Sequence, residues 1–260
     1  MAVTGIAGFQ DFFKEFSDSY VVIGGSACSE WFSEDRIAFR ETHDIDMVLI
    51  VEAKSAAFFS RIWEYARIAG YELLERADGN GKALYRFLHP RTPAYPQMIE
   101  LLTGLPEVVV PEWVKIVHLK PGEEGSSLSA ILLQTAYYEL LLNHRSLSAS
   151  GLPLVNRDAL LLLKVKAYLN LAKEQEEGRF VKSSDLKKHR NDVFQLSYVL
   201  TGTFGSALPP PIQEDLGRFL ALFAPDNPEW SAVQDSLRHV RLPVRDAIRI
   251  IDGIKAYFGL

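Results

Sequence analysis

Short apolar runs alternate with turn residues in the first part of the chain. Residues 20–25, YVVIGG, form a β-rich run that ends in glycines. Residues 45–51, IDMVLIV, form a second run that is apolar on both faces, as in a central strand. Residues 55–70 then place apolar side chains at helical spacing and end at a glycine. These patterns predict a mixed α/β region.

Further strands are predicted in the same region. The pattern predicts two strands, at residues 71–76 and 82–88. The intervening ADGNG is typical of a hairpin turn. Two more strands are predicted at residues 97–102 and 114–120, and a proline-rich loop is part of this region.

From Leu128 onward the pattern becomes helical and strand patterns disappear. The segments predicted to be helical are residues 128–145, 157–174, 183–200, 211–224 and 244–259. The glycine- and serine-rich segment Pro121–Ser127 is the expected boundary. We therefore predict an α/β domain with a mixed sheet over residues 1–124 and a helical bundle over residues 125–260.

Composition and charge narrow the function classes. The 260 residues are 48% hydrophobic and carry a net charge of −5, so no global positive field attracts nucleic acid. The single cysteine, Cys28, allows no intramolecular disulfide and reads as a small core residue. The first residues lack a signal-peptide pattern and no segment is apolar enough to cross a membrane, which predicts a cytoplasmic protein with no membrane partner.

The glycine turn at Gly24, Gly25 and Ser26 is a candidate phosphate site. A strand that ends in two glycines and continues into a helix presents backbone N–H groups, and the positive end of the helix favours an anion. The alternative is a tight turn capped by serine.

Asp44 and Asp46 begin the second apolar run. Residues i and i+2 of a strand face the same side, so these carboxylates are expected to converge. Two like charges placed together need a cation, and Mg²⁺ takes one or two carboxylates together with substrate phosphates. A metal–nucleotide site is therefore predicted, against the alternative of two solvated edge carboxylates.

Residues Val21–Val51 resemble a known family. Gly-Ser, a spacer and Asp-x-Asp resemble the signature of the nucleotidyltransferase superfamily, which has a polymerase β-like fold. FRETHDIDMVLIV resembles the Arg-x-Ser/Thr-x-Asp-x-Asp variant of the AbiEii/MenT-type nucleotidyltransferases, with Arg40 and Thr42 at the matching nucleotide-binding places. The resemblance implies transfer of a nucleoside monophosphate (NMP) from a nucleoside triphosphate (NTP), with Mg²⁺ or Mn²⁺ as cofactor. It also implies an RNA (a tRNA 3′ end) or protein acceptor, and a role as the toxin of a toxin–antitoxin system with a cognate antitoxin.

Glu100 is the candidate for the third carboxylate that this superfamily usually has on a later strand. It is a lone acid in the apolar run QMIELL, where burial requires a partner such as a metal. It would complete the metal site or help to deprotonate the acceptor. The alternative is an outward acid on a half-exposed strand.

Two lysines of the segment from Leu160 separate by helix geometry. Lys164 lies in an apolar stripe and Lys166, about 200° away, on the polar side. Lys164 is a candidate to neutralise a triphosphate, or it lies along the core with its amine in water. Lys-x-x-Ala also resembles the conserved-lysine motif of the AbiEii-like group. Lys166 is expected to be solvated.

Asp185, His189 and Asp192 recur along one side of the next predicted helix. KHRNDVFQL resembles the final motif of the family, with His189 in place of the usual first acid. Either Asp185 or Asp192 is then the functional acid, and Asp192 is preferred because a first-turn acid such as Asp185 is favoured by the helix dipole alone. No other histidine has ligand spacing, so no zinc site is implied.

These motifs predict a cleft between the two domains in which Lys164 and Asp192 face Asp44 and Asp46. Arginines near the C-terminus form either a basic patch for RNA phosphates or a solvated face. They are Arg238, Arg241, Arg245 and Arg249. The rival functions are an antibiotic-type nucleotidyltransferase that modifies a small molecule and a non-catalytic module that binds a nucleotide or an antitoxin.

Overall fold

The computed structural model describes residues 3–50, 56–77, 83–103 and 135–260. The chain divides into two compact units, each of which is described by itself. The sheet unit spans Met1–Ser33, Arg40–Gly125 and His144–Val155. The helical unit spans Glu34–Phe39, Ser126–Asn143 and Asn156–Leu260.

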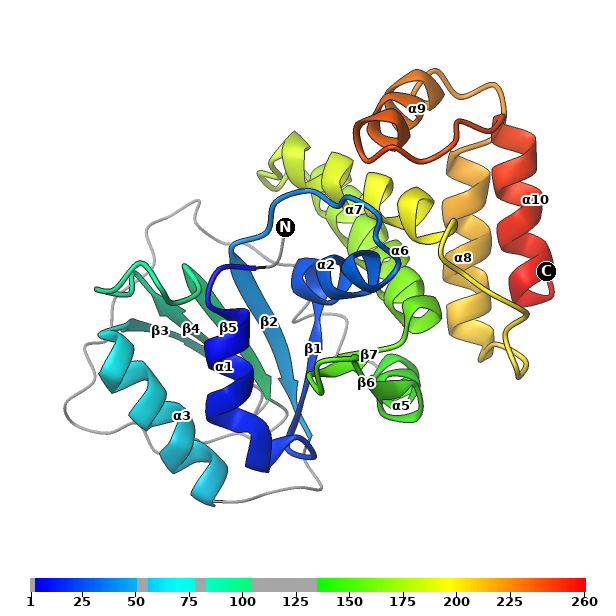
Figure 1. The fold of residues 1–260 in the computed structure, drawn as a ribbon. Coiled ribbons are helices and arrows are strands. Elements are labelled where there is room, and N and C mark those ends of the chain that lie inside the picture. The colour runs from blue at the N-terminus through cyan, green and yellow to red at the C-terminus, as the bar shows by residue number, and fades with distance from the viewer. Residues whose placement is uncertain (1–2, 51–55, 78–82, 104–134) are drawn as a thin grey trace. The chain divides into compact units, whose positions relative to one another are not determined.

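Among the described residues, the sheet unit contains a seven-stranded mixed sheet in the order β3-β4-β5-β2-β1-β7-β6 (Figure 1). The strands are β1 (Tyr20–Ile23), β2 (Asp44–Leu49), β3 (Glu72–Ala77), β4 (Ala83–Leu88), β5 (Met98–Thr103), β6 (Arg145–Leu147) and β7 (Pro153–Val155). The pairs β2/β5 and β1/β7 are parallel and the other neighbours are antiparallel. The central strand β2 is therefore hydrogen-bonded on both edges, and its residues Met47, Val48 and Leu49 are buried.

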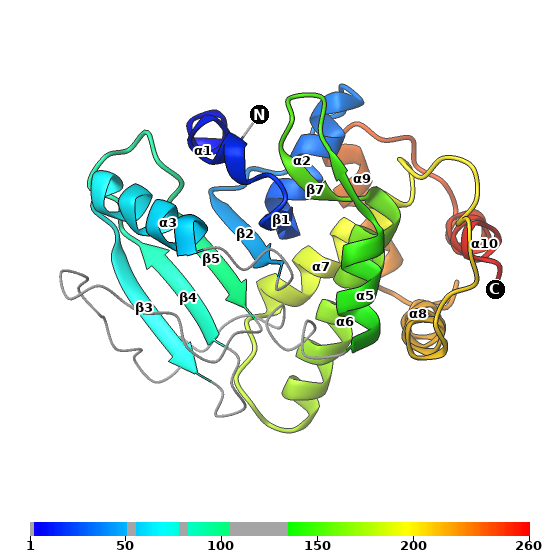
Figure 2. The ribbon, with the colours of Figure 1, turned by 90° about the horizontal axis from the view of Figure 1, so that it is seen from below.

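The sheet unit has three α-helices among its described residues. They are α1 (Ile6–Phe13), followed by the 3₁₀ turn η1 (Lys14–Phe16), α2 (Gly24–Glu34) and α3 (Ala56–Ala69). Figures 1 and 2 show α1 and α3 side by side on one face of the sheet. Their rings meet at Phe13 and Phe58, whose centroids are 5.9 Å apart, and at Phe9 and Tyr65, at 5.6 Å. Such aromatic pairs add stability beyond the area that they bury.

The helical unit is built around α6. Its helices are α5 (Thr135–Asn143), α6 (Arg157–Glu176), α7 (Ser183–Leu196), α8 (Pro210–Leu222), α9 (Trp230–His239) and α10 (Ala247–Phe258). The helix α6 packs against α5, α7 and α8, so apolar and polar positions on several of its sides are buried. No helix among the described residues is long and apolar enough to cross a membrane.

Most predicted elements are confirmed. The antiparallel pair β3/β4 confirms the hairpin, although its predicted turn lies partly outside the described residues. The helices α3, α6, α7, α8 and α10 form where helical spacing predicts them, and α5 forms within residues 128–145. The expected strand over residues 114–120 and the expected boundary at residues 121–127 lie outside the described residues.

One prediction is wrong. Strands do not end at Leu128, because β6 and β7 follow it and join the edge of the sheet. Each of these strands is three residues long, which is too short for the alternation of side chains to show as a period. The sequence analysis also did not predict α1 and α9.

Candidate active site

A row of charged residues crosses three neighbouring strands of the sheet. Asp46 of β2 is in register with Glu100 of β5, and Glu100 is in register with Arg86 of β4. Directly opposed residues of neighbouring strands project to the same face. Asp44 precedes Asp46 by two positions in β2 and shares that face. The predicted convergence of Asp44, Asp46 and Glu100 on one side of the sheet therefore follows from the observed register.

Glu100 is buried and held by Arg86. Only 2% of its surface is exposed, and Arg86 Nε donates a hydrogen bond to Glu100 Oε1 within a buried ion pair. Burial, followed by the negative charge of Asp46, raises the pKa of Glu100 to about 7, although Arg86 opposes this rise. The alternative of an outward, half-exposed acid is therefore wrong.

The glycine turn touches the Asp46 carboxylate. Gly24 begins α2 with a φ of +69°, a conformation that favours glycine. A Cβ atom at this position would overlap Asp46 Oδ2. The turn after β1 can approach the second carboxylate of Asp-x-Asp only because residue 24 has no side chain.

Arg40 and Thr42 lie at the second glycine. A Cβ atom on Gly25 would be 2.9 Å from Thr42 Cγ2 and 3.1 Å from Arg40 Nη2. Ser26 is fully buried, and its hydroxyl donates to the backbone carbonyl of Asp44. In this structure, Ser26 thus ties the start of α2 to the start of β2. The structure brings together all the motif residues of the first predicted site within the sheet unit.

Asp44 and Asp46 are the half-buried acids of this cluster, whereas Glu100 is buried. Within the parts of the chain that the structure describes, no group of three or more histidine, cysteine, aspartate or glutamate side chains is arranged to hold a metal ion. Mg²⁺ commonly takes one or two protein carboxylates and completes its shell with water and substrate phosphates. Asp44 and Asp46 fit that donor set. Glu100 lies beside them but is paired with Arg86.

In the helical unit, Lys164 and Asp192 form a buried ion pair. Lys164 Nζ donates to Asp192 Oδ2 at 2.7 Å, and the two side chains are 3% and 0% exposed. The amine therefore does not lie in water, which was the alternative expectation. Asp185 is in the first turn of α7 and half-buried, so Asp192 is the acid that meets the lysine.

The expectation that Lys166 is solvated is wrong. Lys166 is 9% exposed, and its Nζ donates to Asp215 Oδ2 of α8 at 2.8 Å. Tyr137 of α5 donates its hydroxyl to the same oxygen at 3.0 Å. Helical periodicity in one segment marks the most apolar side of α6, but it does not show that α5 and α8 cover a second side.

Arg86 and Asp215 are the partners that the sequence analysis missed. Arg86 stands alone among apolar residues in ALYRFL, as Glu100 does in QMIELL. A lone base and a lone acid in two predicted strands were the available signal for a buried pair. Asp215 had no such signal, because its helix PIQEDLGRFLAL has several polar neighbours.

Comparisons with protein-family models, with curated proteins and with solved structures find no match to this chain. The family resemblance of residues 21–51 and the shared cleft stay predictions.

The contact between Gly24 and Asp46 predicts that a methyl group added at residue 24 strongly destabilises the fold. We expect Gly24→Ala to lower the free energy of unfolding by more than about 2 kcal/mol, since it adds backbone strain and a clash. Gly8→Ala is the matched control, because Gly8 lies within α1 and an added Cβ would meet nothing within 4 Å. That control should gain about 0.5–1 kcal/mol. Equal urea midpoints for the two variants would contradict this packing.

The charged row predicts that substitutions of Asp46 and of Arg86 shift the pKa of Glu100 in opposite directions. Carboxyl NMR, assigned with Glu100→Gln, should give Glu100 a pKa of about 7. Asp46→Asn should lower this pKa because it removes a negative neighbour, whereas Arg86→Met should raise it because it removes a positive one. A Glu100 pKa near the ordinary 4.5, or shifts of the same sign, would show that the row is not arranged in this way.

Proposed function

We propose that this protein is a nucleotidyltransferase that moves an NMP from a Mg²⁺–NTP to an acceptor hydroxyl. One observation carries the proposal: the glycine turn, Arg40, Thr42, Asp44 and Asp46 occupy one cluster. These residues lie far enough apart in sequence that no single element explains their meeting. Their resemblance to the nucleotidyltransferase motif, and to its AbiEii/MenT-type variant in particular, supports the same assignment.

The sheet unit offers complementary groups to a triphosphate. The start of α2 at Gly24 and Gly25 supplies backbone N–H groups and the positive end of a helix, which suit phosphate oxygens. The Arg40 guanidinium lies beside Gly25 and can pair with the same phosphates. Asp44 and Asp46 would hold Mg²⁺ or Mn²⁺, which when bound neutralises phosphate charge and orients the triphosphate.

The reaction also needs a proton acceptor. The acceptor oxygen attacks the α-phosphorus, the bond to pyrophosphate breaks, and the hydroxyl proton must leave. Glu100 is the candidate for this step because it lies in register with Asp46 on the same face of the sheet. Arg86 positions that carboxyl and keeps its pKa from rising further.

The acceptor proposed from the family resemblance is RNA, at a tRNA 3′ end, or a protein. A role as the toxin of a toxin–antitoxin pair, with a cognate antitoxin as partner, rests on the same resemblance. Transfer to a small molecule would use the same donor site, so the fate of the labelled nucleotide distinguishes these acceptors.

Substitution of either aspartate tests the proposal. We expect Asp44→Asn and Asp46→Asn to fold and to lose at least about 10²-fold in transfer of α-labelled NTP, the scale of one electrostatic stabiliser. The control is Asp11→Asn, an exposed acid of α1. Calorimetry should show tighter NTP binding by the wild type with Mg²⁺ than with EDTA. Equal affinities, or full activity of either site variant, would falsify the assignment; label in RNA, protein or a small molecule identifies the acceptor.

Paired substitutions separate a functional from a structural role of Lys164. Lys164→Met alone should cost about 3–5 kcal/mol, because it leaves the Asp192 carboxylate buried without its cation. Lys164→Met combined with Asp192→Asn should recover most of that stability but still lack transfer activity. The matched control is Lys166→Met combined with Asp215→Asn, which should keep activity. If both double variants transfer label equally well, Lys164 serves only the packing of α6.

A further inference from the structure

The helical unit has a surface pocket of about 260 Å³ between residues 197–203 and α10. We name it the α10 pocket and define it by Tyr198, Gly202, Arg245, Arg249, Ile254 and Tyr257. All of its lining belongs to the helical unit. This volume lies just below the range of about 300–1,000 Å³ for drug-sized ligands, so it suits one small molecule or one residue of a polymer.

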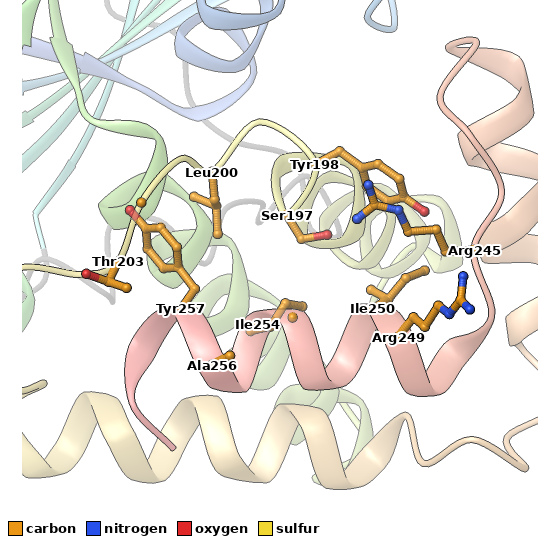
Figure 3. A pocket seen from close by; sticks show the side chains of 12 residues that line it. Ser197, Tyr198, Leu200, Thr203, Arg245, Arg249, Ile250, Ile254, Ala256 and Tyr257 are labelled. Carbon is orange, nitrogen blue, oxygen red and sulfur yellow. The ribbon is translucent and has the colours of Figure 1, made fainter.

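One end of the α10 pocket is cationic. Figure 3 shows Arg245 and Arg249 together at the N-terminal end of α10. The Arg245 guanidinium lies over the Tyr198 ring, 4.7 Å from its centroid, which fixes its position. The nearby acid is Asp246, which caps α10 by accepting from the Arg249 backbone and lies 3.5 Å from Arg249 Nε. Two guanidinium groups against one carboxylate leave this end with a positive charge.

The rest of the pocket is apolar and ends in hydroxyl groups. Ile250 and Ile254, both nearly fully buried, form the floor of its middle, and Thr203 and Tyr257 lie at the end opposite to the arginines (Figure 3). There the Tyr257 hydroxyl is hydrogen-bonded to the Asp158 carboxylate. Arg249 and Tyr257 are eight positions apart on α10, which corresponds to about 12 Å along a helix. Gly253 also lines the pocket, and a Cβ atom added there would meet nothing within 4 Å. The pocket thus has a cationic end, a middle floored by apolar side chains and a polar far end.

We propose that the α10 pocket binds a mononucleotide, with its phosphate at Arg245 and Arg249 and its nucleoside along Ile254 toward Tyr257. Guanidinium groups bind phosphate oxygens with charge-assisted hydrogen bonds, and flat bases pack on apolar and aromatic side chains. An inorganic anion alone would leave most of the 260 Å³ of the pocket unfilled. The chain is acidic overall, with a net charge of −5, so this local positive charge is not part of a general attraction to anions. The proposal is independent of the reaction proposed for Asp44 and Asp46.

The ligand chemistry has two sources, a free nucleotide and a nucleotide within an RNA chain. The test is a titration of the full chain with AMP, with a short single-stranded oligoribonucleotide and with inorganic phosphate. All titrations contain EDTA, so that metal-dependent NTP binding does not contribute. We expect AMP to bind, and inorganic phosphate to bind more weakly than AMP. If the oligoribonucleotide binds much more tightly than AMP and through the same residues, the natural source is RNA; equal binding indicates a free nucleotide.

Variants assign the binding to this pocket. Arg245→Ala and Arg249→Ala should each weaken AMP binding by about tenfold or more, the scale of a lost charge-assisted hydrogen bond. Gly253→Leu should abolish it by filling the pocket. The controls are Arg238→Ala, which removes an exposed arginine of α9, and Gly217→Leu, at a position in α8 where an added Cβ also meets nothing within 4 Å.

Three results would overturn the proposal. They are no AMP binding by the wild type at millimolar concentration, binding that survives Gly253→Leu, and phosphate binding as tight as AMP binding. The last result would indicate a simple anion site. Repeating the titration with Asp44→Asn separates the two hypotheses, because AMP binding at the α10 pocket should persist in a variant that has lost transfer.

Discussion

The charged row of Asp46, Glu100 and Arg86, in which Glu100 and Arg86 are buried, is the constraint on which the sheet unit depends. Two carboxylates placed side by side in a sheet disfavour each other's ionisation, and burial of Glu100 adds a desolvation cost. Arg86 offsets part of this cost only if it lies opposite Glu100 in the register. A slip of one residue between β4 and β5 would move Arg86 to the other face and leave the acid without its cation. The charge state of the site therefore depends on the register of these strands.

The glycine turn depends on the same row. Gly24 approaches the Asp46 carboxylate closely, and Ser26 binds the carbonyl of Asp44, so the start of α2 and the start of β2 are held together. A helix start packed on a carboxylate is electrostatically favourable, because the positive end of the helix meets a negative charge. The same geometry leaves Arg40 and Thr42 against Gly25. The groups that we propose to bind phosphate and metal are thus held together by contacts between the start of α2 and the start of β2.

The parts of this arrangement that follow from local periodicity could be predicted from sequence. Alternation in β2 correctly places Asp44 and Asp46 on one face. Helical phase correctly places Lys164 on a buried side of α6 but wrongly assigns Lys166 to a solvated side. Properties that depend on a second element could not be read in this way. The burial of Lys166 requires α5 and α8, and the partner of Glu100 requires the register of β4. The strands β6 and β7 are three residues long and exist only because β1 offers an edge to β7.

The basic side chains of the helical unit differ in how far they are exposed to solvent. Lys164 and Lys166 are buried, and each is neutralised by a carboxylate from a neighbouring helix, which fixes α6 against α7 on one side and α8 on the other. Arg245 and Arg249 remain exposed at a pocket. A buried pair at 2.7 Å gives up its partner only to a ligand that replaces the whole interaction, since an unpaired buried charge is very costly. Any phosphate that engages Lys164 must therefore compete with Asp192, whereas a phosphate reaches Arg245 and Arg249 without breaking a buried ion pair.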